Sequence, residues 1–492
     1  MPLILPGNVA SAVGGAFEVE NSCRFNGSDS YLHWTDTGQS GSALTLSISL
    51  WCKKCSNGVF NPLVLGRQNG DNFTLLQFDN SDRLDFYSET SNAIKGRLRT
   101  NRKFSDPGAW YHILAIWDGG NATAGNRMRL YVNGVEETSF ETDTNPDEDQ
   151  NSWFNLINQK MHLGYDTGDL DVGHSSAKAF DGYIAQFMVV DGVIKGPTDF
   201  GEFDSDSPTI WKPKDISGEE GTGTNGALLL FKDSSALCAN EHGADAPNDD
   251  WTAVNLAAVD QCVDTPTNNF CTMNSLDNQR QGYTFAEGNC KITSPGSGQY
   301  DFVTGTMGVS AGKWYWETKI ITIPTLDYIY NGISDHVQFT ANWDLGGEAG
   351  QYCLSRVAGK IKLAEGAETT FGGSMSANDI QSFALDADNN KLYIANGGEW
   401  STGSGAWDST TFDANTGAVT IAHATAIVGA SDFWFPALGN GANVMVMSVN
   451  FGNPDYANSS SATDENGYGD FEFAPPTGYL ALCSKNLGSD GG

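Results

Sequence analysis

The sequence predicts an all-β protein made of two antiparallel β-sandwich modules joined by an irregular connector. Segments of alternating apolar and polar residues recur along the chain, as in ALTLSISLW (Ala43–Trp51), and this period of two is typical of strands. Glycine accounts for 57 of the 492 residues, which suits many tight turns, and no useful length of sequence has a helical period. Because this length exceeds one hydrophobic core, we expect two or three domains.

The strand-like segments divide the chain into four parts. These are an N-terminal arm (1–20), a first sandwich (21–196), a connector with short strands (197–270) and a second sandwich (271–492). The arm is too short to fold alone. We expect it to pair with a sheet edge or to dock on a neighbouring subunit.

The first sandwich contains strand-like segments such as YHILAIW and MRLYVNG, and Asn133-Gly134 predicts a tight hairpin turn. Five motifs, among them FNGSDSYLHW (Phe25–Trp34), WYHILAIWDGG (Trp110–Gly120) and FDGYIAQFMVVDGVI (Phe180–Ile194), resemble those of LamG domains. LamG domains are jelly-roll sandwiches of the concanavalin A-like type. The resemblance implies a constant scaffold whose loops, at the rim and the concave face, carry recognition.

The second sandwich begins with a run of aromatic residues, GKWYWE (Gly312–Glu317), which predicts a tight turn followed by a strand. Three later motifs follow in order: FALDADNNKLYIANGGEW (Phe383–Trp400), FWFPALG (Phe433–Gly439) and VNFG (Val449–Gly452). Together the four motifs resemble the SPRY domain. This resemblance implies a jelly-roll-type sandwich that binds partners and carries no chemistry.

The connector and the segment PPTGYLALCSKNL (Pro475–Leu487) resemble parts of virion proteins of marine bacteriophages. This resemblance implies a phage structural or adhesion protein, and for such a protein the arm would attach the module to a capsid or tail base. The partners expected are other virion proteins, further copies of the chain in a homo-oligomer, and a host surface glycan or protein.

The charge is strongly negative, with 60 acidic and 27 basic residues and a net charge of −33. Such a surface repels phosphate backbones and anionic lipids, so we expect neither nucleic-acid binding nor membrane insertion. The opening residues MPLILPGNVA lack the basic and apolar regions of a signal peptide. We therefore expect folding in the host cytoplasm and a final location in the virion.

Nine cysteines are scattered without the spacing of a disulfide framework, which predicts reduced thiols. Cys52 and Cys55 form a C-x-x-C pair, but the alternation of the preceding residues places them at the end of a strand. A redox dithiol is expected at the head of a helix instead. A zinc site would also need a second pair.

No catalytic residue is predicted. The alternative is a laminarinase-like glycoside hydrolase, in which alternating carboxylates on a strand line one cleft. The nearest approach to that pattern is Glu202, Asp204 and Asp206, which lie beyond the last strand predicted for the first sandwich. Solvated linker charge is the simpler interpretation of these three residues.

The LamG resemblance implies calcium as the cofactor to consider, because such domains often hold a hard cation at the rim of the sandwich. Asp166, Asp169 and Asp171 are spaced to bring carboxylates together in one loop, and Asp118 at the end of a predicted strand would add another oxygen. Ordinary turn formation is the alternative explanation for these aspartates.

Aromatic residues in loops rich in Gly, Asp and Asn are the candidates for carbohydrate binding. They are Trp153, Tyr165, Trp343, Trp400 and Trp407. Packing beneath long loops is the alternative for each of them. In the second sandwich, the SPRY resemblance places partner binding in the loops around 321–344 and 399–408.

The leading hypothesis is a non-enzymatic phage tail-fibre or receptor-binding protein that presents its sandwich loops to a host surface. A capsid decoration or head-fibre protein is the close alternative, because the sequence contains no fibre-forming repeat. An intracellular protein-interaction module is a third hypothesis.

Overall fold

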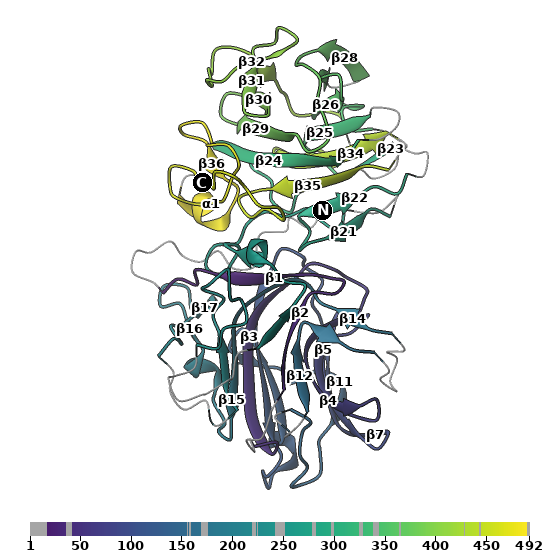
Figure 1. The fold of residues 1–492 in the computed structure, drawn as a ribbon, viewed down its shortest axis with the longest axis vertical. Coiled ribbons are helices and arrows are strands. Elements are labelled where there is room, and N and C mark those ends of the chain that lie inside the picture. Colours follow the sequence, from purple (N-terminus) through teal and green to yellow (C-terminus); the bar gives the residue numbers. More distant parts are fainter. Residues whose placement is uncertain are drawn as a thin grey trace. The chain divides into compact units, whose positions relative to one another are not determined.

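The computed structural model is almost entirely β-structure, so the predicted fold class is confirmed (Figure 1). It describes residues 17–35, 42–154, 156, 159–168, 176–218, 223, 225–241, 251–277, 282–296, 300–323, 328–337, 344–363, 366–427, 429–441 and 444–489. These residues fall into two compact units, which divide between Thr267 and Asn268.

The first unit contains two large antiparallel sheets. The first sheet has the order β10-β9-β8-β3-β15-β1-β20, with β18 also paired to β15. Its strands are β1 (Ser22–Asn26), β3 (Thr45–Lys54), β8 (Trp110–Asp118), β9 (Met128–Val132), β10 (Val135–Glu136), β15 (Asp181–Asp191), β18 (Ala227–Leu229) and β20 (Gln261–Cys262).

The second sheet has the order β11-β7-β6-β5-β4-β12-β2-β19. Its strands are β2 (Tyr31–Thr35), β4 (Asn61–Asn69), β5 (Asn72–Phe78), β6 (Arg83–Thr90), β7 (Ala93–Lys103), β11 (Phe140–Thr144), β12 (Lys160–Leu163) and β19 (Thr252–Val254). Two small hairpins and three short 3₁₀ helices complete the unit: β13 (Tyr165–Asp166) with β14 (Lys178–Ala179), β16 (Gly201–Phe203) with β17 (Trp211–Pro213), η1 (Ala124–Asn126), η2 (Pro197–Asp199) and η3 (Ala258–Asp260).

The core of the first unit lies between the two sheets. Ile48 and Trp117 enter it from the first sheet, and Val64 and Phe86 enter it from the second. The alternation predicted for the strands therefore places one set of side chains in the core and the other set on an outer face. The predicted hairpin turn is also confirmed: Asn133 and Gly134 both have positive φ, 49° and 77°, between β9 and β10.

Residues of the predicted connector complete the sheets of the first unit. β18 pairs with β15, β19 pairs with β2, and β20 pairs with β1. The apolar side chains of this region, such as Leu229 and Trp251, are buried in the core between the sheets. Burial of these side chains explains why the segment packs on the first unit and is not an open linker.

The second unit also contains two sheets. The larger has the order β21-β22-β35-β24-β29-β30-β31-β32, with β33 paired to β30 and β36 to β24. Its strands are β21 (Thr284–Ala286), β22 (Lys291–Thr293), β24 (Lys313–Thr322), β29 (Ile380–Asp386), β30 (Lys391–Asn396), β31 (Glu399–Ser401), β32 (Trp407–Ser409), β33 (Val419–Thr420), β35 (Val446–Asn450) and β36 (Leu480–Ala481).

The smaller sheet of the second unit has the order β23-β34-β25-β26-β27-β28. Its strands are β23 (Tyr300–Thr304), β25 (Ile329–Ser334), β26 (Gln351–Arg356), β27 (Lys360–Leu363), β28 (Ala367–Thr370) and β34 (Phe435–Gly441). A single helical turn, α1 (Ser484–Ser489), follows β36.

The aromatic run predicted as a strand forms β24, and its alternation is as expected. Trp314 and Trp316 pack in the core between the two sheets, while Tyr315 lies in a separate cluster. Glu317 is buried and accepts four hydrogen bonds, from Tyr315 Oη, Asn450 Nδ2 and the backbone N–H groups of Glu472 and Phe473, at 2.8 to 3.1 Å. This carboxyl group thereby attaches the segment at 472–473 to the sheet.

Of the predicted N-terminal arm, residues 1–16 lie outside the described residues. The rest runs along the first unit, where the backbone N–H and C=O of Val19 both hydrogen-bond to Thr267 Oγ1, at 3.1 and 3.2 Å. All nine cysteines are free thiols, as predicted, and all except Cys238 are buried. No helix in the described ranges is long and apolar enough to cross a membrane.

Candidate functional site

The outer face of the second sheet of the first unit carries a row of side chains that includes two imidazoles and a tyrosine. His162 on β12 lies directly opposite His33 on β2 and Leu65 on β4. Leu65 in turn lies opposite Leu75 on β5, and Leu75 opposite Tyr87 on β6. Side chains of directly paired residues project to the same face, so the register places these five residues in one row across the sheet.

Two tyrosines stack beside the histidines of this row. Tyr31 lies two residues before His33 on β2, and its ring stacks on Tyr165 of β13 with centroids 4.4 Å apart and an interplanar angle of 12°. Tyr31 also lies 6.0 Å from His33 and 5.9 Å from His162. We call Tyr31, His33, His162 and Tyr165 the tyrosine–histidine cluster. Both tyrosines and His33 are partly exposed, whereas His162 is buried.

The imidazoles of the cluster are neutral at physiological pH. Burial, with the nearby His33 and Lys160, lowers the pKa of His162 to about 3. Burial and Lys160 also lower the pKa of His33. The Nδ1 atoms of both histidines are buried and have no hydrogen-bond partner among the described residues. Neutral imidazole both donates and accepts hydrogen bonds, so the cluster combines ring faces with groups that can bind hydroxyls.

A buried ion pair borders the row at Tyr87. Arg97 Nε and Nη2 donate to the two carboxylate oxygens of Asp85 at 2.9 and 2.6 Å, and the guanidinium lies 4.7 Å from the centre of the Tyr87 ring. Arg67 on β4 donates through Nη1 to Thr167 Oγ1 and to the carbonyl oxygen of Gly168, which fixes the turn that follows Tyr165. Both arginines on this face therefore already have hydrogen-bond partners.

The structure brings one of the predicted ligand-binding residues, Tyr165, into this cluster. Trp153 lies elsewhere: its indole Nε1 donates to the carbonyl oxygen of Glu89 at 2.7 Å and to Thr90 Oγ1 at 3.1 Å. In the second unit, Trp400 packs edge-to-face on Phe412 at 5.0 Å, and Trp407 packs near Phe371 at 6.4 Å. The fifth predicted residue, Trp343, lies outside the described residues.

Two of the predicted calcium ligands, Asp118 and Asp166, lie on strands of different sheets in the first unit. Asp118 ends β8 in the first sheet and accepts a hydrogen bond from Asn121 Nδ2 at 2.9 Å. Asp166 is buried on β13, where Oδ1 accepts from the Gly168 N–H at 2.9 Å. Asp169 and Asp171 lie outside the described residues. Within the ranges described, no group of three or more His, Cys, Asp or Glu side chains is arranged to hold a metal ion.

The carboxylates considered for glycoside hydrolysis lie on β16 (Glu202) and in the turn between β16 and β17 (Asp204 and Asp206). Glu202 and Asp204 both pair with Lys212 across the hairpin, at 3.2 and 3.6 Å. Hydrogen bonds from the backbone N–H groups of Ser207 and Asp206, with the nearby Lys212, lower the pKa of Asp204. The segment forms a short strand that the sequence does not predict, separate from the two large sheets.

Three members of the cluster, Tyr31, His33 and His162, were not predicted from the sequence. One signal was present: in the motif FNGSDSYLHW, Tyr31 and His33 alternate with the apolar Leu32 and Trp34. That alternation marks a polar aromatic face on a strand. The position of His162 opposite His33 depends on the strand register, which the sequence does not show.

Comparison with known proteins agrees with this architecture. Residues 26–197 match a protein family that is described as the concanavalin A-like lectin/glucanases superfamily. This part of the chain has the concanavalin A-like lectin fold, as its motifs predicted. The chain has no match among curated proteins.

Several solved structures resemble parts of the chain. A SAP-like pentraxin from Limulus polyphemus is 15% identical over 37% of this chain and 80% of its own, with a TM-score of 0.27. The SPRY domain of human HERC1 is 14% identical over 32% of this chain and 86% of its own, with a TM-score of 0.23. The third is domain 4 of AbnA, a GH43 extracellular arabinanase from Geobacillus stearothermophilus, in complex with arabinotriose. It is 20% identical over 34% of this chain and 68% of its own, with a TM-score of 0.25.

Proposed function

We propose that this protein is a non-enzymatic binding protein and that its tyrosine–histidine cluster binds carbohydrate. The observation that carries the proposal is the stacked pair of Tyr31 and Tyr165 beside two neutral imidazoles on one face of a sheet. The family matched by residues 26–197 is one of lectins and glucanases, which agrees with a sugar ligand.

The chemistry of the cluster suits a sugar ring. A partly exposed tyrosine ring offers an apolar surface to the C–H groups of a sugar, and its hydroxyl remains available for a hydrogen bond. His33 is partly exposed on the same strand as Tyr31, and its neutral imidazole is suited to bind a sugar hydroxyl. Binding of this kind changes little with pH above the lowered pKa of His33.

The carboxylates of Asp85 and Asp166, near the tyrosine–histidine cluster, favour binding of a sugar without hydrolysis. Glycosidases need two carboxyl groups on either side of the scissile bond. Here the carboxylate of Asp85 is committed to a bidentate pair with Arg97, and that of Asp166 accepts from the backbone of its own turn. These hydrogen bonds support the proposed binding role, and an assay for release of reducing sugar tests the enzymatic alternative.

A glycan array probed with the full chain tests the proposal. We expect retention of particular glycans, with binding at least about tenfold weaker in Tyr31→Ala and Tyr165→Ala, because the loss of one stacking ring removes a central contact. Tyr328→Ala is the matched control, since Tyr328 stacks on Tyr330 at 6.1 Å in the second unit. Absence of any retained glycan, or equal loss in all three variants, would contradict the proposal.

The virion remains the proposed location of this binding activity. Its support is the resemblance of the connector and of Pro475–Leu487 to phage virion proteins. Immunogold electron microscopy of phage particles with antibody against the second unit tests it. Label at the tail would favour receptor binding, label over the head would favour capsid decoration, and unlabelled particles would refute the virion location.

A further inference from the structure

A cavity of about 240 Å³ opens on the first sheet of the first unit, away from the tyrosine–histidine cluster. It lies where β15 changes partners: Ile184 pairs with Cys23 of β1, whereas Phe187 pairs with Leu229 of β18. Gln186 lies between these two pairings. The cavity therefore occupies the gap between the start of β1 and the end of β18, beside a continuous strand.

The backbone at Gln186 is unusual. On its other side β15 pairs with β3, and the register shifts between Ala185 and Met188, so Gln186 and Phe187 together oppose a single residue. Gln186 has φ of +46° in this bulge, a conformation that favours glycine. A bulge redirects the side chain that it carries, and strained non-glycine residues of this kind gather at functional sites.

The Gln186 amide is oriented into the cavity. Its Nε2 donates to the carbonyl oxygen of Lys214 at 3.0 Å, and since that atom is an acceptor, the contact defines which end of the amide is nitrogen. Its Oε1 is buried and has no hydrogen-bond partner among the described residues, although the side chain is only 3% exposed. A buried carbonyl oxygen without a donor is costly, so this position is suited to a ligand N–H or O–H.

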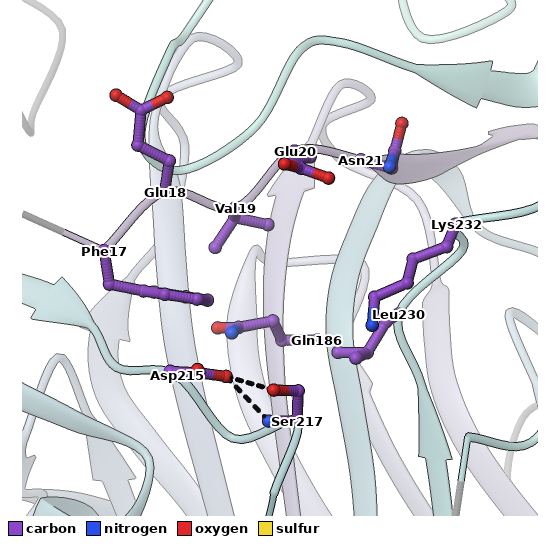
Figure 2. Close-up of a pocket in the computed structure, with 10 residues that line it drawn as sticks. All are labelled: Phe17, Glu18, Val19, Glu20, Asn21, Gln186, Asp215, Ser217, Leu230 and Lys232. Atoms are coloured by element: carbon purple, nitrogen blue, oxygen red, sulfur yellow. Dashed lines mark hydrogen bonds between the residues drawn. The ribbon is translucent and has the colours of Figure 1, made fainter.

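The walls of the cavity are fixed and rich in acceptors. Figure 2 shows Phe17 and Val19 on the segment that leads into β1, Leu230 and Lys232 opposite, and Asp215 with Ser217 below the Gln186 amide. Thr267 Oγ1 binds both backbone groups of Val19, and Asp215 Oδ1 accepts from the backbone N–H and Oγ of Ser217 at 2.9 and 2.6 Å.

The charge of this lining favours a cation. Glu18, Glu20 and Asp215 are acidic lining residues, and Lys232, whose Nζ lies 3.8 Å from Glu241 Oε2, is the basic one. Figure 2 shows the Glu18 carboxylate pointing away from the cavity, so those of Glu20 and Asp215 are set against one ammonium. The apolar wall includes the Phe17 ring, and an aromatic face also attracts cations. At roughly 30 Å³ per water molecule, the cavity has room for about eight waters, which suits a ligand the size of one side chain.

We propose that this cavity is a second binding site, which takes an ammonium or guanidinium group on a short apolar stem. Gln186 Oε1 accepts a hydrogen bond from the cationic head, Asp215 supplies the counter-charge, and Phe17, Val19 and Leu230 cover the stem. The ligand is either a free small amine or a lysine or arginine side chain of a partner protein. This site does not depend on the carbohydrate proposal.

Ligand-observed saturation-transfer NMR on the full chain tests the site. The probes are butylguanidine, butylamine and the blocked peptide Gly-Gly-Arg-Gly-Gly, with butylurea as the neutral analogue of butylguanidine. We expect saturation transfer to the cations and little to butylurea. Stronger binding of the butyl probes would identify a small-molecule site, and stronger binding of the peptide would identify a protein partner.

Variants connect the signal to the cavity. Gln186→Met keeps the side-chain length without the amide oxygen and should weaken butylguanidine binding at least about tenfold. Asp215→Asn removes one charge from an exposed residue at the rim of the cavity and should weaken butylguanidine binding several-fold. Because the residue is exposed, this second variant is expected to fold. Gln261→Met is the control, because Gln261 Nε2 also donates to a main-chain carbonyl, that of Phe231 at 2.7 Å, outside the cavity. Equal binding of butylurea, unchanged binding in Asp215→Asn, or no signal from any cation would overturn the proposal.

Discussion

Asp335 Oδ1 lies 2.6 Å from His336 Nδ1, and both side chains are buried in the second unit. On the other side of the imidazole, Nε2 lies 3.3 Å from Glu348 Oε2 and 3.0 Å from Gln351 Nε2. His423 Nδ1 approaches the second oxygen of Asp335 at 3.4 Å. Burial lowers the pKa of His336, but hydrogen bonds to Asp335 and Glu348 outweigh burial and raise it.

This raised pKa predicts a pH-dependent stability of the second unit. The folded state binds the His336 proton more tightly than the unfolded state, so the stabilisation is present below about pH 6.5 and is lost as pH rises through the raised pKa. Thermal unfolding of the full chain between pH 6 and pH 8.5 measures it. His336→Gln should reduce this slope to the part that Glu317 contributes, whereas His33→Gln in the first unit should keep it in full. An unchanged slope in His336→Gln would contradict the prediction.

The Glu317 carboxyl group predicts a second change of stability with pH, at lower pH than that of His336. Burial raises the pKa of Glu317 to about 7, in spite of its four hydrogen-bond donors. Ionisation therefore opposes folding, and stability should fall by about 3 kcal/mol as pH rises from about 4.5 to about 7. Chemical denaturation at pH 5 and pH 7 compares the two states. The fall should disappear in Glu317→Gln, and its persistence there would assign it to another group.

Gly134 should be intolerant of a side chain. A Cβ atom there would lie 2.3 Å from the Trp211 ring, and φ is +77°. In Gly58→Ala, where φ is +71° and the space is open, only the backbone strain of roughly 1 kcal/mol applies. We expect Gly134→Ala to cost a further 1–3 kcal/mol, roughly, because Trp211 must move. Urea unfolding of both variants measures the difference, and equal losses would show that the Trp211 contact is unimportant.

Calcium binding remains a prediction with a direct test. If Asp166 contributes to a calcium site, the melting temperature should rise with millimolar CaCl₂ and return to its starting value with EDTA. Asp166→Ala should abolish the rise in melting temperature with CaCl₂. The same measurement on Asp118→Ala shows whether Asp118, on a different sheet, contributes to that rise. A melting temperature that is the same in CaCl₂ and EDTA would exclude calcium as a structural cofactor.

The fold could be predicted from the sequence to the extent that it depends on local alternation and turn chemistry. The strand β3 and the Asn133-Gly134 turn follow from such local signals, and so does the placement of Trp314 and Trp316 in a core. Short strands were predicted in the connector, but not that β18, β19 and β20 join the sheets of the first unit. They have two or three residues each, and only pairing with distant strands makes them part of a sheet.

The candidate site was predicted less completely for the same reason. Tyr165 was found as a loop aromatic, but its partner Tyr31 lies on a strand far away in the sequence. Whether His33 and His162 meet depends on the register of β2 and β12, and a shift of one residue would turn each strand's side chains to the other face. Gln186 carries no sequence signal, since a bulge results from strand pairing.

The contribution of β18, β19 and β20 to the first unit affects how the chain can be made. A recombinant fragment that ends at residue 197, where the family match ends, would leave β1, β2 and β15 with unpaired edges that can recruit other chains. During synthesis the first unit cannot be complete until Cys262 has left the ribosome, so a chaperone that shields exposed strands would act in that interval. A fragment that extends to Thr267 is therefore the shortest one expected to keep these strand edges paired during expression.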